Sequence, residues 1–153
     1  MERIETTAIR NLIHNEEYCR KVLPFIKEEY FIDRLEKLIF TEIYQFVNKY
    51  NNLPTKESLS IEMNTNKGVS EDEYKRMNEI ISSLNPEPIN LDWLVETTEV
   101  WCKDRAIHNA ILGGIQILDG KDKDHTPEYL PEMLTEALSV SFDQKVGHDY
   151  LLE

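Results

Sequence analysis

The stretch from Leu91 to Leu118 constrains the fold of this chain most strongly, because its 28 residues contain no proline. Asn90 precedes it as an N-cap residue would, Asp92 lies in its first turn, and Gly120 follows its end as a C-cap glycine would. One unbroken helix of this length extends about 40 Å, whereas a domain of this size has a radius of gyration of about 15 Å. The sequence therefore predicts one helix that is longer than the globule to which it belongs.

The apolar residues of this helix fall on two rows instead of one stripe. One row consists of Trp93, Val100, Ile107, Ile111 and Leu118, and the other of Leu91, Val95, Cys102, Ala106, Ala110 and Ile117. Two apolar faces indicate two partners, namely a second helix of the same chain and another chain. The alternative is a long helix through the middle of a monomeric bundle. The residues expected at a contact between chains are Trp93, Val100, Trp101, Ile107, Ile111, Gly113, Gly114, Leu130 and Leu134.

The pair Gly113 and Gly114 is unusual inside so long a helix, because each interior glycine costs about 0.8–1 kcal/mol relative to alanine. Close backbone-to-backbone packing against the helix that contains Leu130 and Leu134 would account for the pair. An early end of the helix before Ile115 would also account for it, and so would a kink at the glycines.

The remainder of the chain also has helical spacing, and no segment alternates with period two. Helices are expected after caps at Thr6 or Thr7, Asn15, Thr55, Ser70 and Thr126, with Glu73 completing a capping box and Pro127 at the first helical position. A further strong helix is expected from about Asp33 to Tyr50. The sequence therefore predicts an all-α fold, in which a globular helical bundle is followed by a projecting antiparallel helical hairpin. The prolines of Asn85-Pro86-Glu87-Pro88 mark the boundary, which gives a bundle over 1–88, a hairpin over 89–141 and a linker from 142 to 153.

Composition and charge narrow the classes of function. The net charge is −12, and residues 51–153 hold 9 basic and 20 acidic side chains. Such a surface repels phosphate, so tight DNA binding by this chain alone is not expected, although acidity also simply favours solubility. No apolar window is long enough to span a membrane, and the N-terminus has no signal-peptide pattern. Cys19 and Cys102 are interpreted as buried thiols in a reducing compartment.

The sequence offers no catalytic, cofactor-binding or metal-binding residues. The segment from Gly114 to Asp122 departs from a phosphate-binding loop in its spacing and lacks the required serine or threonine. The four histidines are scattered, and no Glu-x-x-His pair of the kind that holds two irons in a helical bundle is present. We therefore expect no metal, no cofactor and no catalysis in this chain.

Several segments, taken in order, resemble one family. They are EEYCRKVLPFIKEEYF (16–31), FTEIYQFVNKYNNLPT (40–55), NLDWLVETTEVWCKDRA (90–106) and EALSVSFDQKVGHDY (136–150). Together they are similar to the N-terminal part of T-even-phage-type, DnaB-like replicative DNA helicases. The last segment resembles the linker to the ATPase domain of that family, with Ser141, Phe142, Asp143, Val146, Gly147, His148 and Asp149 as its motif.

The resemblance implies a non-catalytic collar domain in the cytoplasm of an infected bacterium. In that family these domains pair through helical hairpins on a hexameric ring and contact primase and the helicase loader. In that family ATP and Mg²⁺ are used by the ATPase domain that follows in the sequence. The resemblance implies that this chain is a domain separated from such a longer helicase. Two other hypotheses remain: a free-standing acidic helical adaptor that binds a partner protein, and an enzyme with a cofactor inside the bundle.

Overall fold

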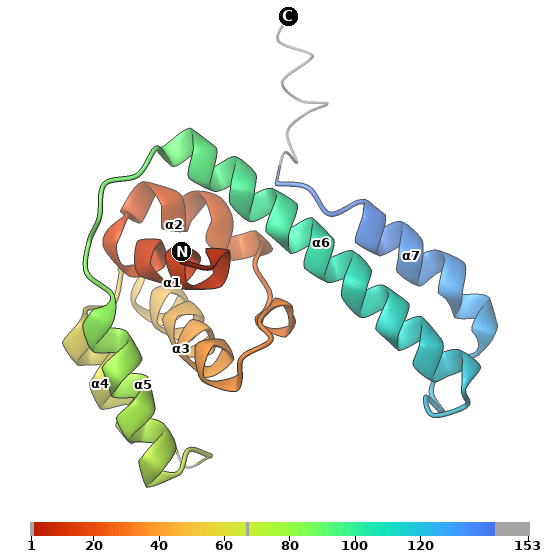
Figure 1. Ribbon diagram of the computed structural model, residues 1–153, viewed down its shortest axis with the longest axis horizontal. Helices are drawn as coiled ribbons and strands as arrows, with labels where there is room; N and C mark the ends of the chain where they lie inside the picture. Colours follow the sequence, from red (N-terminus) through yellow and green to blue (C-terminus); the bar gives the residue numbers. More distant parts are fainter. Residues whose placement is uncertain (1, 67, 143–153) are drawn as a thin grey trace, which may run out of the picture. The chain divides into compact units, whose positions relative to one another are not determined.

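The computed structural model describes residues 2–66 and 68–142, which form helices and connecting turns and contain no strand. This confirms the predicted all-α class. The chain divides into two compact units, Met1–Val95 and Glu96–Glu153. The division falls inside the long helix α6 (Leu91–Leu118), drawn in green to cyan in Figure 1, whereas the sequence placed its boundary at residue 88.

The first unit consists of five helices and the start of α6. They are α1 (Ile4–His14), α2 (Glu16–Val22), α3 (Arg34–Tyr50), α4 (Lys56–Asn64) and α5 (Glu71–Ser83), with 3₁₀ turns at Leu23–Phe25 and Glu28–Tyr30. The fully buried side chains come from every one of these helices; among them are Ile9, Leu12, Tyr18, Ile39, Ile43, Leu59, Met77 and Leu94. Phe31 stacks on Phe40 with ring centroids 5.0 Å apart. One apolar core therefore holds the unit together.

Local capping contacts set most of the helix starts, as predicted. The Asn15 side chain accepts a hydrogen bond from the Tyr18 amide at the start of α2. At α5, Ser70 Oγ accepts from the Glu73 amide at 3.1 Å, and Glu73 Oε1 accepts from the Ser70 amide at 3.2 Å. Asn90 Oδ1 accepts from the Trp93 amide at 2.8 Å and so begins α6. These side chains satisfy amides that a first helical turn leaves unpaired.

Two of the expected caps are wrong, and the first of them is at the N-terminus. The first helix begins at Ile4 after Arg3, so Thr6 and Thr7 lie inside it. The Thr7 hydroxyl bonds to the Glu2 carboxylate and the Arg3 carbonyl, at 2.7 and 3.2 Å, and is therefore satisfied within the helix.

The second wrong cap lies near the other end of the chain. Pro127 opens a 3₁₀ turn, Pro127–Tyr129, and Thr126 makes no side-chain cap. Helix α7 (Leu130–Leu138) begins only after this turn. Pro131 has no N–H to donate to the carbonyl of Pro127, which explains why a regular α-helix does not start at Pro127.

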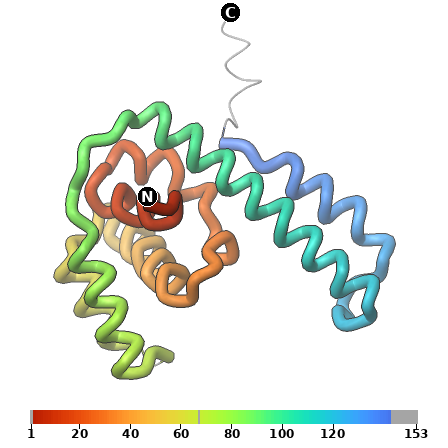
Figure 2. Tube along the Cα trace, viewed as in Figure 1, coloured from red at the N-terminus to blue at the C-terminus, as the bar shows by residue number. Residues whose placement is uncertain are grey.

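The second unit contains most of α6 together with α7, and its contacts make the two helices antiparallel. The end of α6 meets the start of α7, where Gly114 lies beside Leu130. The carboxylate of Glu99, near the start of α6, accepts hydrogen bonds from Ser141 Oγ at 3.1 Å and from the Phe142 amide at 2.9 Å. Figure 2 shows the chain turning back between them. No described helix has the length and apolar character needed to cross a membrane.

A turn of polar residues joins α6 to α7. Gly120 has a φ of +76°, the left-handed conformation that favours glycine after a helix end. Asp122 Oδ2 lies 2.9 Å from His125 Nδ1, and the His125 ring stacks on Tyr129 with centroids 4.4 Å apart. The hydrogen bond from His125 is the largest cause of a lowered pKa for the Asp122 carboxyl. The turn is therefore held by its own side chains.

Candidate self-association surface

Glycines in α6 allow α7 to lie close to it. A β-carbon on Gly114 would stand 2.9 Å from Leu130 Cδ2, and one on Gly113 would stand 2.9 Å from Met133 Cε. An early helix end at the glycines is excluded, because α6 continues to Leu118. The close approach of the two helices that the sequence suggested is present. The groups that lie beside the glycines are side chains of α7, those of Leu130 and Met133, and not the α7 backbone.

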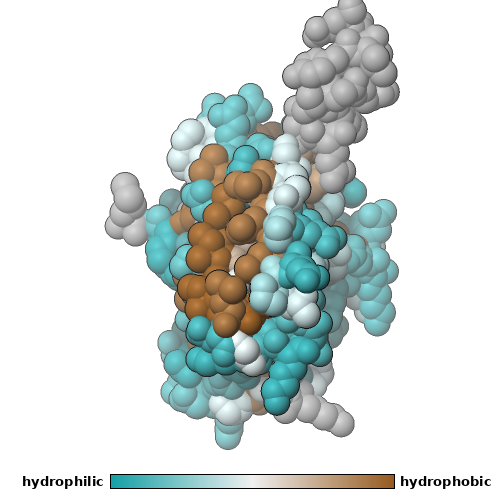
Figure 3. All heavy atoms as spheres, turned by 90° about the vertical axis from the view of Figure 1, so that its right-hand side faces the viewer, coloured by the Kyte–Doolittle hydropathy of each residue, from teal (hydrophilic) through white to brown (hydrophobic). Residues whose placement is uncertain are grey.

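In the second unit, α6 and α7 also expose large apolar side chains. We call these residues the hairpin face: Val100, Ile111, Leu112, Ile115 and Leu118 of α6, with Leu134 and Leu138 of α7. Leu118 is 65% exposed, Val100 58% and Ile111 50%. Figure 3 shows a continuous hydrophobic area, in brown, over this part of the molecule. A monomer rarely leaves a large contiguous apolar patch in water, so such a patch is typical of a binding surface.

Helical geometry explains why much of this set shares one side of α6. Ile115 and Leu118 follow Ile111 by four and seven residues, and Val100 precedes it by eleven, all close to whole numbers of turns. Of the other predicted row, Cys102 and Ile117 are buried. The two rows therefore have different environments: one is largely covered and the other lies largely in water.

The residues predicted at a contact between chains differ in their exposure to solvent and in the unit to which they belong. Val100, Ile111 and Leu134 are exposed on the second unit, and Trp93 is exposed on the first. Ile107 is half-buried. Trp101 is buried, so it does not belong to the exposed surface on which the sequence placed it.

Four members of the hairpin face, Leu112, Ile115, Leu118 and Leu138, were not among the residues predicted at a contact between chains, although Leu118 was placed on the same row as Ile111. Ile115 and Leu138 had a usable signal, because each follows a predicted contact residue, Ile111 or Leu134, by four residues on one side of a helix. Leu112 had no such signal, since spacing along a single helix does not say whether a neighbour covers a side chain.

The expected linker motif is only partly described by the structure. Ser141 and Phe142 both contact the Glu99 carboxylate. Asp143, Val146, Gly147, His148 and Asp149 lie outside the described residues.

The exposed apolar side chains of the second unit are suited to binding by apolar contact. No group of three or more His, Cys, Asp or Glu side chains in the described ranges is arranged to hold a metal ion. Burial raises the pKa of the Cys19 thiol to about 11 and raises the pKa of Cys102 as well. Both thiols therefore stay protonated near neutral pH and behave as small apolar side chains.

No protein-family model matches the chain. The chain is 32% identical over 151 residues to a DnaB-like replicative helicase of Enterobacteria phage T4. The aligned region covers 94% of this chain and 32% of that helicase, so the chain spans about a third of the length of the curated relative it matches. An alignment of that extent includes most of the segments that suggested a resemblance. This chain is therefore a relative of the phage DnaB-like replicative helicases.

Proposed function

We propose that this chain is the N-terminal, non-catalytic region of a phage replicative helicase and acts in DNA replication as an oligomerisation domain. In this proposal the hairpin face pairs with the same face of a second copy, and the paired domains form a collar on the hexameric ring of the full-length protein. ATP and Mg²⁺ act in another domain of that protein. The proposal places the protein in the cytoplasm of the infected host, where primase and the helicase loader are its further partners.

The observation that carries the proposal is the apolar hairpin face in a relative of a helicase. Burying one half-exposed leucine, isoleucine or valine contributes about 1 kcal/mol, so the seven side chains of each copy contribute up to about 14 kcal/mol in a pair. Association costs about 4–15 kcal/mol in lost translational and rotational freedom. The two amounts are comparable, and we therefore expect self-association that depends visibly on protein concentration.

Sedimentation equilibrium of the wild-type chain and two matched variants tests the pairing. Ile111→Asp places a charge on the hairpin face, while Ile61→Asp makes the same change on α4 in the first unit, where Ile61 is 66% exposed. We expect the apparent mass of the wild type and of Ile61→Asp to rise with concentration, and Ile111→Asp to stay monomeric. Circular dichroism establishes that each variant is folded. A wild type that is monomeric at millimolar concentration would contradict the proposal.

A second measurement addresses catalysis and DNA. The chain is expected not to hydrolyse ATP, because its sequence contains no phosphate-binding loop, and its net charge of −12 is expected to prevent tight binding to duplex DNA at physiological salt. ATP hydrolysis that co-purifies with the chain and persists in an independent preparation would refute the non-catalytic assignment.

An acidic helical adaptor is the second candidate function, favoured by the excess of acidic side chains after residue 50. The two proposals differ in what the hairpin face binds. A chain that remains monomeric, but loses binding to a host protein in Ile111→Asp and keeps it in Ile61→Asp, would favour the adaptor.

A further inference from the structure

The segment from Leu84 to Asn90, here called the strap, joins α5 to α6 within the first unit and has no regular secondary structure. The side chain of Leu84 is fully buried, whereas Pro86, Glu87 and Pro88 are exposed. Apolar burial therefore fixes the first residue of the strap but not its middle.

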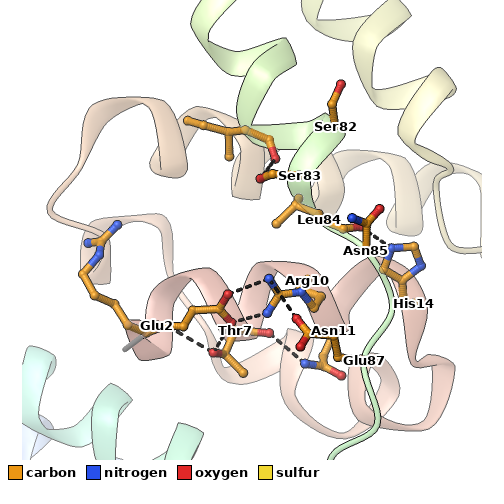
Figure 4. A network of polar contacts seen from close by, with 12 residues as sticks. Glu2, Thr7, Arg10, Asn11, His14, Ser82, Ser83, Leu84, Asn85 and Glu87 are labelled. Carbon is orange, nitrogen blue, oxygen red and sulfur yellow. Dashed lines mark hydrogen bonds and ion pairs between the residues drawn. The ribbon is translucent and has the colours of Figure 1, made fainter.

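Polar contacts hold the beginning of the strap to the helices beside it. His14 Nε2 of α1 lies 2.6 Å from the carbonyl oxygen of Leu84. Lys56 Nζ of α4 donates to Asn85 Oδ1 at 2.7 Å and to the carbonyl of Ser82 at 3.1 Å. Figure 4 shows His14 facing this stretch of chain. These contacts leave the part after Asn85 to be held by other groups.

The middle of the strap is held by one ion pair on a buried arginine. Arg10 is 8% exposed, and its Nη2 lies 3.4 Å from the carboxylate of Glu87. The same guanidinium pairs with both oxygens of the Glu2 carboxylate, with Nη2 to Oε2 at 2.5 Å (Figure 4). Glu87 is therefore the second and more distant of two carboxylates that share one cation.

Two hollows lie beside the strap, and Glu87 lines both of them. The larger has a volume of about 480 Å³ and the smaller about 170 Å³. Both are lined by Asn11 of α1 and by Glu87, Pro88 and Ile89 of the strap. Both hollows are open to solvent. The strap therefore bridges over α1 at Glu87–Ile89 instead of packing into it.

We propose that the strap is a latch, closed by the Glu87–Arg10 ion pair, that detaches from α1 while the core of the first unit stays folded. Three features keep the free-energy cost of this opening low. The middle of the strap buries little apolar surface, the ion pair is long and exposed on its Glu87 side, and Arg10 keeps Glu2 as its partner when Glu87 leaves. A buried charge left without a partner would oppose opening, and Glu2 prevents that. Opening frees the segment that leads into α6 without melting either helix.

Thiol labelling with a bulky maleimide tests the latch. Asn11 is buried beneath the strap, so Asn11→Cys places a thiol that an open strap exposes. Cys19, buried in α2, is a built-in reporter of unfolding in the same molecule. We expect the introduced thiol to react at least about ten-fold faster than Cys19. Low urea should leave the labelling rate of the introduced thiol nearly unchanged while it raises the Cys19 rate, because local opening exposes little surface.

Two further substitutions in the Asn11→Cys background assign the latch to its ion pair. Glu87→Gln removes the contact with Arg10, and we expect it to speed labelling of the introduced thiol by about two- to five-fold, as for an exposed ion pair, without changing the Cys19 rate. Glu16→Gln is the matched control, because Glu16 lines the larger hollow but pairs with Arg20 within α2. We expect it to leave the rate of the introduced thiol unchanged.

Equal labelling rates for the introduced thiol and Cys19 would overturn the latch, since the new thiol would then be exposed only by unfolding. An unchanged rate for the introduced thiol in Glu87→Gln would overturn the role of the ion pair. If Asn11→Cys does not fold, Thr7→Cys, which lines the smaller hollow and is half-buried, replaces it. The comparison is then between Thr7→Cys with Glu87 and with Glu87→Gln: faster labelling in the second supports the latch, and equal rates overturn it.

Discussion

Replacing Gly114 with alanine tests how closely α6 and α7 pack. The new β-carbon would lie 2.9 Å from Leu130 Cδ2, where ordinary carbon contacts are about 3.5–4.0 Å. Overpacking of this kind costs about 1–3 kcal/mol, and removal of a helical glycine returns about 0.8–1 kcal/mol. Gly114 is buried, so the methyl group has no route into solvent. We expect Gly114→Ala to lower the free energy of unfolding by up to about 2 kcal/mol.

Gly113→Ala is the matched comparison, one residue away on the same helix. Its β-carbon would also lie 2.9 Å from a neighbour, but that atom is Met133 Cε, the end of a flexible side chain. A methionine terminus moves aside easily, so the gain in helix propensity should dominate. We expect Gly113→Ala to raise the free energy of unfolding by up to about 1 kcal/mol. The two adjacent substitutions should therefore act in opposite directions.

The assay is urea denaturation followed by circular dichroism at two protein concentrations, which separates stability within one chain from stability due to self-association. Leu130→Ala removes the atom that Gly114→Ala would contact, so the double variant should be less destabilised than the sum of the single variants. Stabilisation of similar size in both glycine variants, with no change of oligomer mass, would refute the close packing.

Local geometry yields three more predictions. Gly120→Ala should lower stability by about 1–2 kcal/mol, because the left-handed backbone and not a steric contact opposes a side chain there; chemical denaturation measures it. Ser70→Ala should cost about 1 kcal/mol in the same assay through loss of the capping box with Glu73. The hydrogen-bonded ion pair with Arg10 lowers the pKa of the Glu2 carboxyl below its usual value, so its stabilisation is present above pH 4.5 and is lost as the pH falls through the folded-state pKa. The stability difference between wild type and Glu2→Gln should therefore shrink when denaturation is repeated in steps from about pH 6 to about pH 3.

The sequence by itself determined the features that depend on neighbours along the chain. The caps at Asn15, Ser70 and Asn90 follow from side chains that meet amides within a few residues, and these predictions are confirmed. The end of α6 at Leu118 follows from Gly120, which adopts the left-handed backbone after the helix, and is confirmed as well. The all-α class followed in the same way from helical spacing. These contacts join residues only a few positions apart, so the amino-acid pattern of one segment is sufficient to predict them.

Only the tertiary structure decided which apolar residues are covered. Trp93 and Trp101 lie on the same helix and looked equally suited to a surface contact, yet one is exposed and the other buried. Burial depends on groups distant in the sequence, which spacing along one helix does not specify. The same holds for the strap, where Arg10 of the first helix meets Glu87 from a remote part of the chain. Two prolines predicted a break there, but the carboxylates that share Arg10 and the hollows beside them arise only when the helices assemble.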